Sequence, residues 1–129
     1  MTGYGRVSEK IVRELADIVG PSAVVTDEEK MQPYSHDEVS EAMYVKMPEV
    51  VVKPETKDQV CRIMKLANRE RIPVTPRGAG TGLSAGCVPM LGGIVLALER
   101  MNRLVEIDKQ NLFMIVEPGV TTGEIQKAA

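Results

Sequence analysis

The segment from Pro76 to Gly86 constrains the fold most, because its alternating glycines directly follow a short apolar strand. Glycine adopts positive φ without steric cost and lets backbone N–H groups converge on one point. Gly78, Gly80 and Gly82 are therefore candidates for an anion-binding loop. The guanidinium of Arg77 adds a permanently charged planar fork that suits a diphosphate. Taken alone, such a loop is more often an ordinary turn than a phosphate site.

Two other phosphate-binding motifs fit this segment poorly. A P-loop needs a Gly-Lys pair, and the sequence contains none. Gly80 to Ala85 fits a variant of the dinucleotide fingerprint, and Glu99 lies near the spacing of a ribose-binding acid. That fingerprint must open a helix, whereas Pro89 and the pair Gly92-Gly93 would stop one. The sequence therefore argues against a Rossmann site.

The residues from Val50 to Thr75 predict a βαβ unit. A β-branched run at 50–52 indicates a short buried strand, Thr56 begins a helix with a capping box, and 72–75 is the next strand. The two strands should be parallel, with a right-handed crossover. Ligands of open α/β sheets bind at the carboxyl ends of strands, where the glycine loop begins. The apolar face of the helix is predicted to comprise Val60, Ile63, Met64 and Ala67.

Further elements are predicted on both sides of this unit. A helix of about three turns begins at Ser8 and ends at Gly20-Pro21, followed by a loop-rich segment at 24–47. Later strands are predicted at 94–98, 104–107 and 113–116, the last two forming a hairpin, and Thr121 caps a final helix. Because this helix has barely two turns, we expect the sequence to be part of a longer chain.

Composition excludes several classes of function. With 129 residues, 43% of them hydrophobic, the chain suffices for one modest domain. A net charge of −2, three tyrosines, one phenylalanine and no tryptophan argue against nucleic-acid binding. Cys61 and Cys87 lack the spacing of a metal or redox pair and are interpreted as buried thiols in a reducing compartment. No signal peptide or membrane-spanning segment is visible, so the expected location is cytoplasmic.

Two groups of polar residues invite a functional interpretation that we do not favour. His36 and Asp37 could form a general base, because a carboxylate can orient an imidazole. Their position in a polar loop instead predicts exposed side chains. Since His36 is the sole histidine, a histidine-ligated metal cluster is not expected. Glu99 and Arg100 are expected to be solvated charges.

A series of short motifs resembles a known family when their order and spacing are taken together. They are Tyr34-Ser35-x-Asp37, Pro48-Glu49-Val50-Val51-Val52-x-Pro54, the strand and loop from Val74 to Ser84, Met101-Asn102-Arg103, and Glu117-Pro118-Gly119-Val120. This series is similar to the FAD-binding domain of the vanillyl-alcohol oxidase/p-cresol methylhydroxylase (PCMH) type. Within that family it resembles the glycolate oxidase/D-lactate dehydrogenase branch.

The resemblance implies an α+β, PCMH-type FAD-binding fold, of which this chain holds the first subdomain: a βαβ unit followed by further short strands. Residues 1–47 would be an N-terminal helix and loop-rich extension, and residues 48–129 the first part of the domain. FAD would be non-covalent, because Thr81 stands where covalent branches carry a histidine. The implied cofactor-binding residues are Pro76, Arg77, Gly78, Ala79, Gly80, Thr81, Gly82, Leu83, Ser84, Met101, Pro118 and Gly119.

By the same resemblance, the parent protein would be an FAD-dependent 2-hydroxyacid dehydrogenase. Relatives carry their catalytic histidines and arginine in a later domain, so no catalytic or metal-binding residue is assigned here, and the isolated chain is expected to be inactive. Some relatives work with an iron–sulfur partner protein. Two alternatives remain open: a non-catalytic nucleotide- or anion-binding module, and an FAD oxidase of the same fold acting on a sugar or another alcohol.

Overall fold

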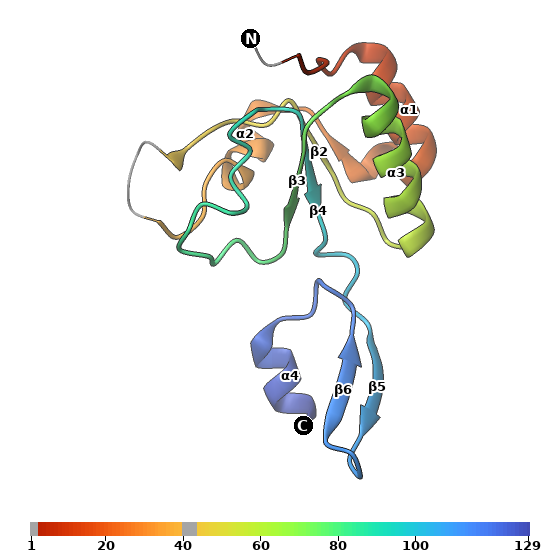
Figure 1. The fold of residues 1–129 in the computed structure, drawn as a ribbon, viewed down its shortest axis with the longest axis vertical. Helices are drawn as coiled ribbons and strands as arrows, with labels where there is room; N and C mark the ends of the chain where they lie inside the picture. Colours follow the sequence, from red (N-terminus) through yellow and green to blue (C-terminus); the bar gives the residue numbers. More distant parts are fainter. Residues whose placement is uncertain (1–2, 40–43) are drawn as a thin grey trace.

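A mixed sheet of four short strands forms the centre of the computed structural model, which describes residues 3–39 and 44–129 (Figure 1). The strands are β1 (Val24–Val25), β2 (Val50–Val52), β3 (Val74–Arg77) and β4 (Ile94–Ala97), in the order β1-β2-β4-β3. β4 pairs in parallel with both β2 and β3, and β1 pairs antiparallel to β2. The predicted parallel arrangement of β2 and β3 is confirmed, with β4 inserted between them.

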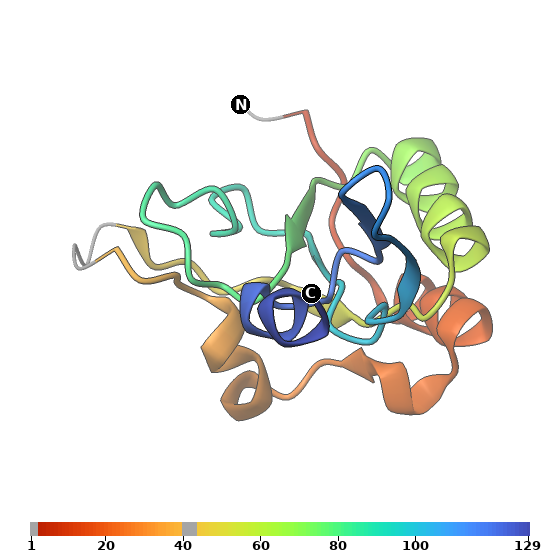
Figure 2. The ribbon, with the colours of Figure 1, turned by 90° about the horizontal axis from the view of Figure 1, so that it is seen from below.

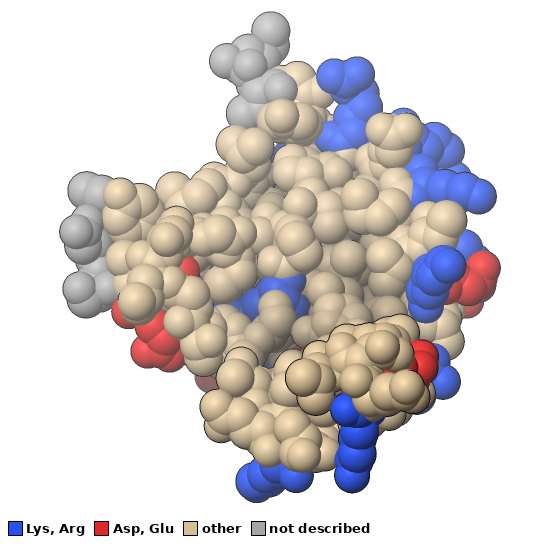
Figure 3. Space-filling view, turned by 60° about the horizontal axis from the view of Figure 1, so that its bottom comes forward, with Lys and Arg blue, Asp and Glu red and all other residues tan. Residues whose placement is uncertain are grey.

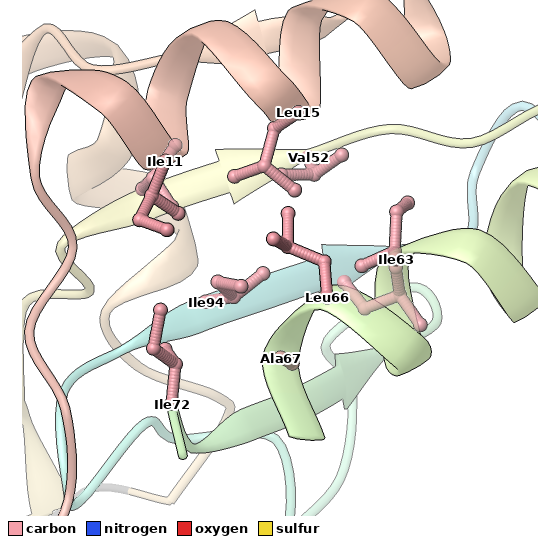
Figure 4. Close-up of a cluster of buried hydrophobic side chains, with 10 residues drawn as sticks. Ile11, Leu15, Val52, Ile63, Leu66, Ala67, Ile72 and Ile94 are labelled. Carbon is pink, nitrogen blue, oxygen red and sulfur yellow. The ribbon is translucent and has the colours of Figure 1, made fainter. Parts of the chain in front are cut away.

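Successive side chains of a strand point to opposite faces of the sheet, and both faces are covered by other parts of the chain. One face packs against α1 (Glu9–Val19) and α3 (Lys57–Glu70), as Figure 4 shows. The opposite face packs against Met31 of α2 (Glu28–Met31). The strand residues on the first face are Val50, Val52, Ile94 and Leu96, and those on the second are Val51, Val95 and Ala97.

The two long helices begin at the predicted caps. The side-chain oxygens of Ser8 and Thr56 accept hydrogen bonds from the N–H groups three residues later, at distances of 3.4 and 3.1 Å. In α3, Ile63 and Ala67 are buried as predicted. The prediction that Met64 belongs to the buried face is wrong, because Met64 is 44% exposed. Each helical residue turns by about 100°, which carries position 64 away from a face centred on 63 and 67.

Two further expectations around α3 need correction. Cys61 is exposed on this helix, so it is not a buried thiol, and Cys87 is half-buried. The strand predicted at 72–75 begins two residues later, because Ile72 still belongs to the end of the helix. Its N–H donates to the carbonyl of Ala67 at 2.9 Å after Arg71 adopts a left-handed conformation with φ 56°.

Among its described residues, the segment predicted to be rich in loops contains short regular elements. These are β1, α2 and a turn of 3₁₀ helix, η2 (Gln32–Tyr34). β1 escaped prediction because its two residues are too few to show alternation, and its position depends on pairing with β2. Within the predicted range, residues 40–43 lie outside the described residues.

Residues 104–128 form a hairpin and a helix that lie beyond one end of the sheet (Figure 1) and in front of it when the molecule is seen from below (Figure 2). The predicted hairpin is confirmed by antiparallel pairing of β5 (Leu104–Asp108) with β6 (Phe113–Val116). α4 (Thr122–Ala128) follows with the expected capping box between Thr121 and Glu124. Across the described residues, no helix is both long and apolar enough to cross a bilayer.

Candidate cofactor-binding site

Three charged residues meet at one edge of the sheet, where the parallel strands end. Lys53 directly follows β2, Arg77 is the last residue of β3, and Glu99 lies two residues past the end of β4. Carboxyl ends of parallel strands lie at the same edge, which is where open α/β sheets bind ligands. Tyr34 lies among them, with its ring centroid 5.5 Å from both Lys53 Nζ and Arg77 Cζ.

Glu99 is the shared acceptor of this cluster. Its Oε1 accepts a hydrogen bond from Tyr34 Oη at 2.5 Å and lies 3.2 Å from Lys53 Nζ. Desolvation alone would raise the pKa of Glu99, but the bonds from Tyr34 and Lys53 and the nearby positive charges outweigh it and lower the pKa. Glu99 is exposed as expected, yet it is also bonded, so a purely solvated charge was the wrong interpretation.

The same contacts shift both partners of Glu99. Desolvation and the hydrogen bond to Glu99 raise the pKa of Tyr34 above its usual value. For Lys53, desolvation would lower the pKa, but its bonds to Tyr34 and Glu99 outweigh that effect and raise it. These contacts therefore favour the neutral form of Tyr34, which donates to Glu99, and the charged form of Lys53.

Arg77 is buried at the base of the glycine loop, with 9% of its surface exposed. Its Nη1 donates to the carbonyl of His36 at 2.7 Å and lies 3.5 Å from Cys87 Sγ. Gly80 passes over this guanidinium with φ +75°, and a Cβ there would overlap it. The predicted positive φ is thus found at Gly80, whereas Gly78 and Gly82 do not adopt it.

The loop offers a row of backbone N–H groups for which the described residues supply no acceptor. Within the described parts of the chain, the N–H groups from Gly78 to Ser84 donate no hydrogen bond to another residue. A Cβ at Gly78 would meet no atom within 4 Å, so no packing within the described residues explains glycine there. N–H groups without a partner among the described residues, open space beside Gly78 and the buried guanidinium of Arg77 form a cradle whose donors suit a diphosphate.

His36 and Asp37 do not form a catalytic pair. Asp37 is only 5% exposed, so the expectation of an exposed side chain is wrong. Its oxygens accept hydrogen bonds from the N–H groups of Val39 and Ala85, each at 2.8 Å. His36 Nδ1 instead lies 3.2 Å from Ser35 Oγ. The motif Tyr34-Ser35-x-Asp37 was the sequence signal for this structural role.

A pocket of about 440 Å³ opens beside the loop, between this edge of the sheet and the turn that precedes α4. Figure 3 shows a hollow on this side of the molecule with basic side-chain atoms at its bottom. The residues that line the pocket are Pro33, Tyr34, Arg77, Gly78, Ala79, Glu99, Asn102, Pro118, Gly119, Val120, Thr121 and Glu124.

The structure brings some of the predicted site residues together at this pocket. Arg77, Gly78, Ala79, Pro118 and Gly119 line it. Met101 is buried, and its carbonyl accepts a hydrogen bond from the N–H of Gly119 at 2.7 Å. The remaining predicted residues do not line it: Pro76 lies within β3, and Gly80, Thr81, Gly82, Leu83 and Ser84 lie further along the loop.

Sequence reasoning left several lining residues without an assignment. Tyr34 and Asn102 belong to the motifs of the resemblance, which gave them no role. Thr121 and Glu124 were assigned only to the helix cap. Whether such residues face a pocket depends on how the turn at 117–121 packs on the turn after β4, which local patterns do not encode. Gly119 permits that packing, because a Cβ there would overlap the carbonyls of Leu98 and Met101.

A family model described as an FAD binding domain matches residues 48–129, well over half of the chain. The chain belongs to this FAD-binding domain family. Its similarity to glycolate oxidase subunit GlcD of Bacillus subtilis is 34% identity over 122 residues, covering 95% of this chain and 26% of that protein. A D-lactate dehydrogenase of Anaerostipes hadrus is 34% identical over 127 residues, covering 98% and 26% of the two chains.

Solved structures agree on the PCMH-type fold of this FAD-binding domain. p-Cresol methylhydroxylase with bound substrate superposes with a TM-score of 0.81 at 25% identity, covering 95% of this chain and 25% of that one. 4-Ethylphenol oxidase from Gulosibacter chungangensis gives 0.82 at 28% identity, covering 97% and 25%. The chain thus spans about a quarter of the length of the relatives it matches. FAD is the cofactor of the family, and the cradle fits its diphosphate.

Proposed function

We propose that the glycine loop from Pro76 to Ser84 binds the diphosphate of FAD through its backbone N–H groups. The observation that carries this proposal is the row of N–H groups that lack a partner within the described residues, next to an open pocket. The dinucleotide would run through that pocket, past Pro118 and Gly119, with Met101 supporting them from behind. Thr81 in the loop offers no nucleophile of the kind that attaches flavin, and binding would be non-covalent.

Charge within the pocket supports this placement. The buried guanidinium of Arg77 adds positive potential behind the loop, where the shielding by water is weak. Glu99 and Glu124 lie among the lining residues and would repel a diphosphate placed against them. The phosphates would therefore lie on the loop, and the acidic residues would face uncharged hydroxyl or amine groups of the nucleotide.

For the whole protein we propose the oxidation of a small 2-hydroxy acid. The support is the similarity to a glycolate oxidase component and to a D-lactate dehydrogenase, each at 34% identity. Bound flavin would supply the redox chemistry by accepting hydride from the carbon that bears the hydroxyl. No residue of this chain is assigned to the chemical step. An iron–sulfur partner protein and a cytoplasmic location belong to the same proposal, the latter supported by two unbridged cysteines.

A second candidate substrate class has its own support. p-Cresol methylhydroxylase and 4-ethylphenol oxidase share the fold at 25% and 28% identity, which favours an oxidase of phenols. The test is dye reduction by the FAD-loaded protein with glycolate, D-lactate, p-cresol or 4-ethylphenol. Turnover with a hydroxy acid supports the first proposal, and turnover with a phenol alone supports the second. FAD binding without turnover on any of them would favour a non-catalytic binding module.

A further inference from the structure

We propose that Asp37 is a positioning residue that holds the glycine loop in the shape needed to bind a diphosphate before the ligand arrives. Asp37 is buried and is not among the residues that line the pocket, so we assign it no direct contact with the ligand. Its effect would pass through the backbone of the loop. The inference rests on the proposed binding of FAD, and it assigns a role to a residue outside the cofactor contacts.

The far half of the loop is tied to the segment around Asp37 by two bonds. Asp37 Oδ2 accepts the N–H of Ala85 at 2.8 Å, and the N–H of Glu38 donates to the carbonyl of Gly82 at 3.1 Å. Ala85 has φ 58°, a left-handed conformation that is unfavourable for a residue with a Cβ. The carboxylate therefore stabilises a backbone turn that the sequence does not favour by itself.

The first residues of the loop are also held by the segment around Asp37. Arg77, at the start of the loop, donates to the carbonyl of His36 at 2.7 Å. Residues 36 to 38 thus hold both ends of the loop, one through an arginine and the other through an aspartate. Between these ties, the N–H groups from Gly78 to Ser84 make no bond to another described residue.

Such a frame matters because a loop with several glycines has many accessible conformations. Ordering the backbone of one residue costs about 1–2 kcal/mol, and a loop that is ordered only on binding loses that amount from its affinity. A carboxylate suits the role because both oxygens of Asp37 accept N–H groups, from Val39 and Ala85. An amide has one acceptor oxygen, and its NH₂ group would face one of these donors.

The experiment compares Asp37→Asn with Glu38→Gln in the intact protein. Glu38 is an exposed neighbour whose contribution to the loop is its backbone N–H, which the substitution retains. Binding of FAD, ADP and adenosine is measured by calorimetry. Exchange of amide hydrogens is measured without ligand for the peptide covering 78–88 and for the α3 peptide 57–70. Asp37→Ser, which keeps one acceptor oxygen, serves if Asp37→Asn does not fold.

We expect Asp37→Asn to weaken FAD and ADP about tenfold or more, the equivalent of one lost hydrogen bond to a charged group. Adenosine, which has no phosphate, should change less than twofold. Exchange at 78–88 should accelerate while the α3 peptide stays protected, and Glu38→Gln should behave as the wild type. Unchanged exchange at 78–88, or equal losses for ADP and adenosine, would overturn the inference.

Failure of the underlying binding proposal gives a different result. If the wild-type protein binds neither FAD nor ADP, the proposed function is wrong. The exchange measurement needs no ligand, so it still decides whether Asp37 orders the loop.

Discussion

At the scale of single residues, the glycines of this chain serve different physical needs. Gly80 has a positive φ and passes over the guanidinium of Arg77, Gly78 faces open space at the pocket, and Gly119 allows two turns to touch. Their substitution should therefore have different consequences. A Cβ at Gly80 or Gly119 disturbs the protein itself, whereas a Cβ at Gly78 would first meet a ligand.

Gly80→Val is expected to abolish binding of FAD and ADP while the sheet and its helices persist. Valine penalises positive φ, and its branched side chain would displace Arg77, at a cost of about 1–3 kcal/mol in stability. Affinity by calorimetry and folding by circular dichroism check both parts. Gly86→Ala is the matched control, because a Cβ there meets no atom within 4 Å and no positive φ is required. Unchanged affinity in Gly80→Val would remove the loop from the site.

Arg77→Ala is expected to weaken FAD binding by about 1.5–3 kcal/mol, the range for a hydrogen bond that involves a charged group. It also removes the hydrogen bond from Arg77 to the partly buried carbonyl of His36, so the free energy of unfolding should fall. Riboflavin separates the two effects, because it lacks the diphosphate. An equal loss of affinity for FAD and riboflavin would show that Arg77 acts through general destabilisation.

Residue patterns could predict the loop, but not the φ angle of each glycine or the burial of the residues around it. The alternating glycines and the arginine after an apolar strand predict an anion site, and the N–H groups of this loop find no acceptor among the described residues. Which glycine needs positive φ depends on the path of the chain over Arg77, and no local pattern records that path. The burial of Asp37 was missed for the same reason, because its partner Ala85 lies 48 residues away.

At the scale of elements, the three parallel strands deliver Lys53, Arg77 and Glu99 to one edge of the sheet. The strands themselves were predictable from short β-branched runs and their flanking prolines and glycines. Their order was not, because β4 enters between β2 and β3, and two-residue β1 is defined by pairing alone. The cluster with Tyr34 follows from that order, so it could be found only in the structure.

Stability should depend on pH through this cluster. The pKa of Glu99 is lowered in the fold, so its contribution is present above the ordinary glutamate pKa of about 4.3 and is lost as pH falls through the folded value. The pKa values of Tyr34 and Lys53 are raised in the fold. Their contributions to stability are therefore present below pH about 10 and are lost as pH rises through the folded pKa values. Wild type and Glu99→Gln should therefore differ in Tm at pH 7 and converge at both extremes.

The size of that difference should be small, because the side chain of Glu99 is 48% exposed. Exposed ion pairs contribute about 0.2–1 kcal/mol, which corresponds to a few degrees in Tm at most. Thermal melts from pH 3 to 11 measure it, with Glu106→Gln on the exposed side of β5 as the control. A difference that stays constant across this range would contradict the assigned role of the cluster.

At the scale of the whole molecule, the hairpin with α4 forms a part separate from the sheet with its helices (Figure 1). The pocket takes residues from the loop after β3 and from the turn before α4, so both parts contribute to it. The hairpin carries several apolar side chains that are more than two fifths exposed, Leu112, Phe113 and Ile115 among them. The family and its fold were predictable from the motifs. The separation of the hairpin from the sheet and the exposure of its apolar side chains were not, because both depend on how the whole chain packs.

The 129-residue chain expressed by itself is expected to purify colourless and to leave glycolate and D-lactate unoxidised when FAD and an artificial electron acceptor are added. The loop and pocket provide donors for the diphosphate and its neighbouring groups. Flavin chemistry also requires the substrate carbon to be held against the reactive ring, and contacts to a diphosphate do not supply that geometry. Weak binding of ADP or pyrophosphate should survive through Arg77 and the backbone amides of Gly78 to Gly82. Calorimetry with FAD, ADP and AMP, together with a dye-reduction assay, measures both parts. Stoichiometric yellow flavin retained through gel filtration, or turnover above a control without protein, would contradict this expectation and show that these residues alone form a working flavin site.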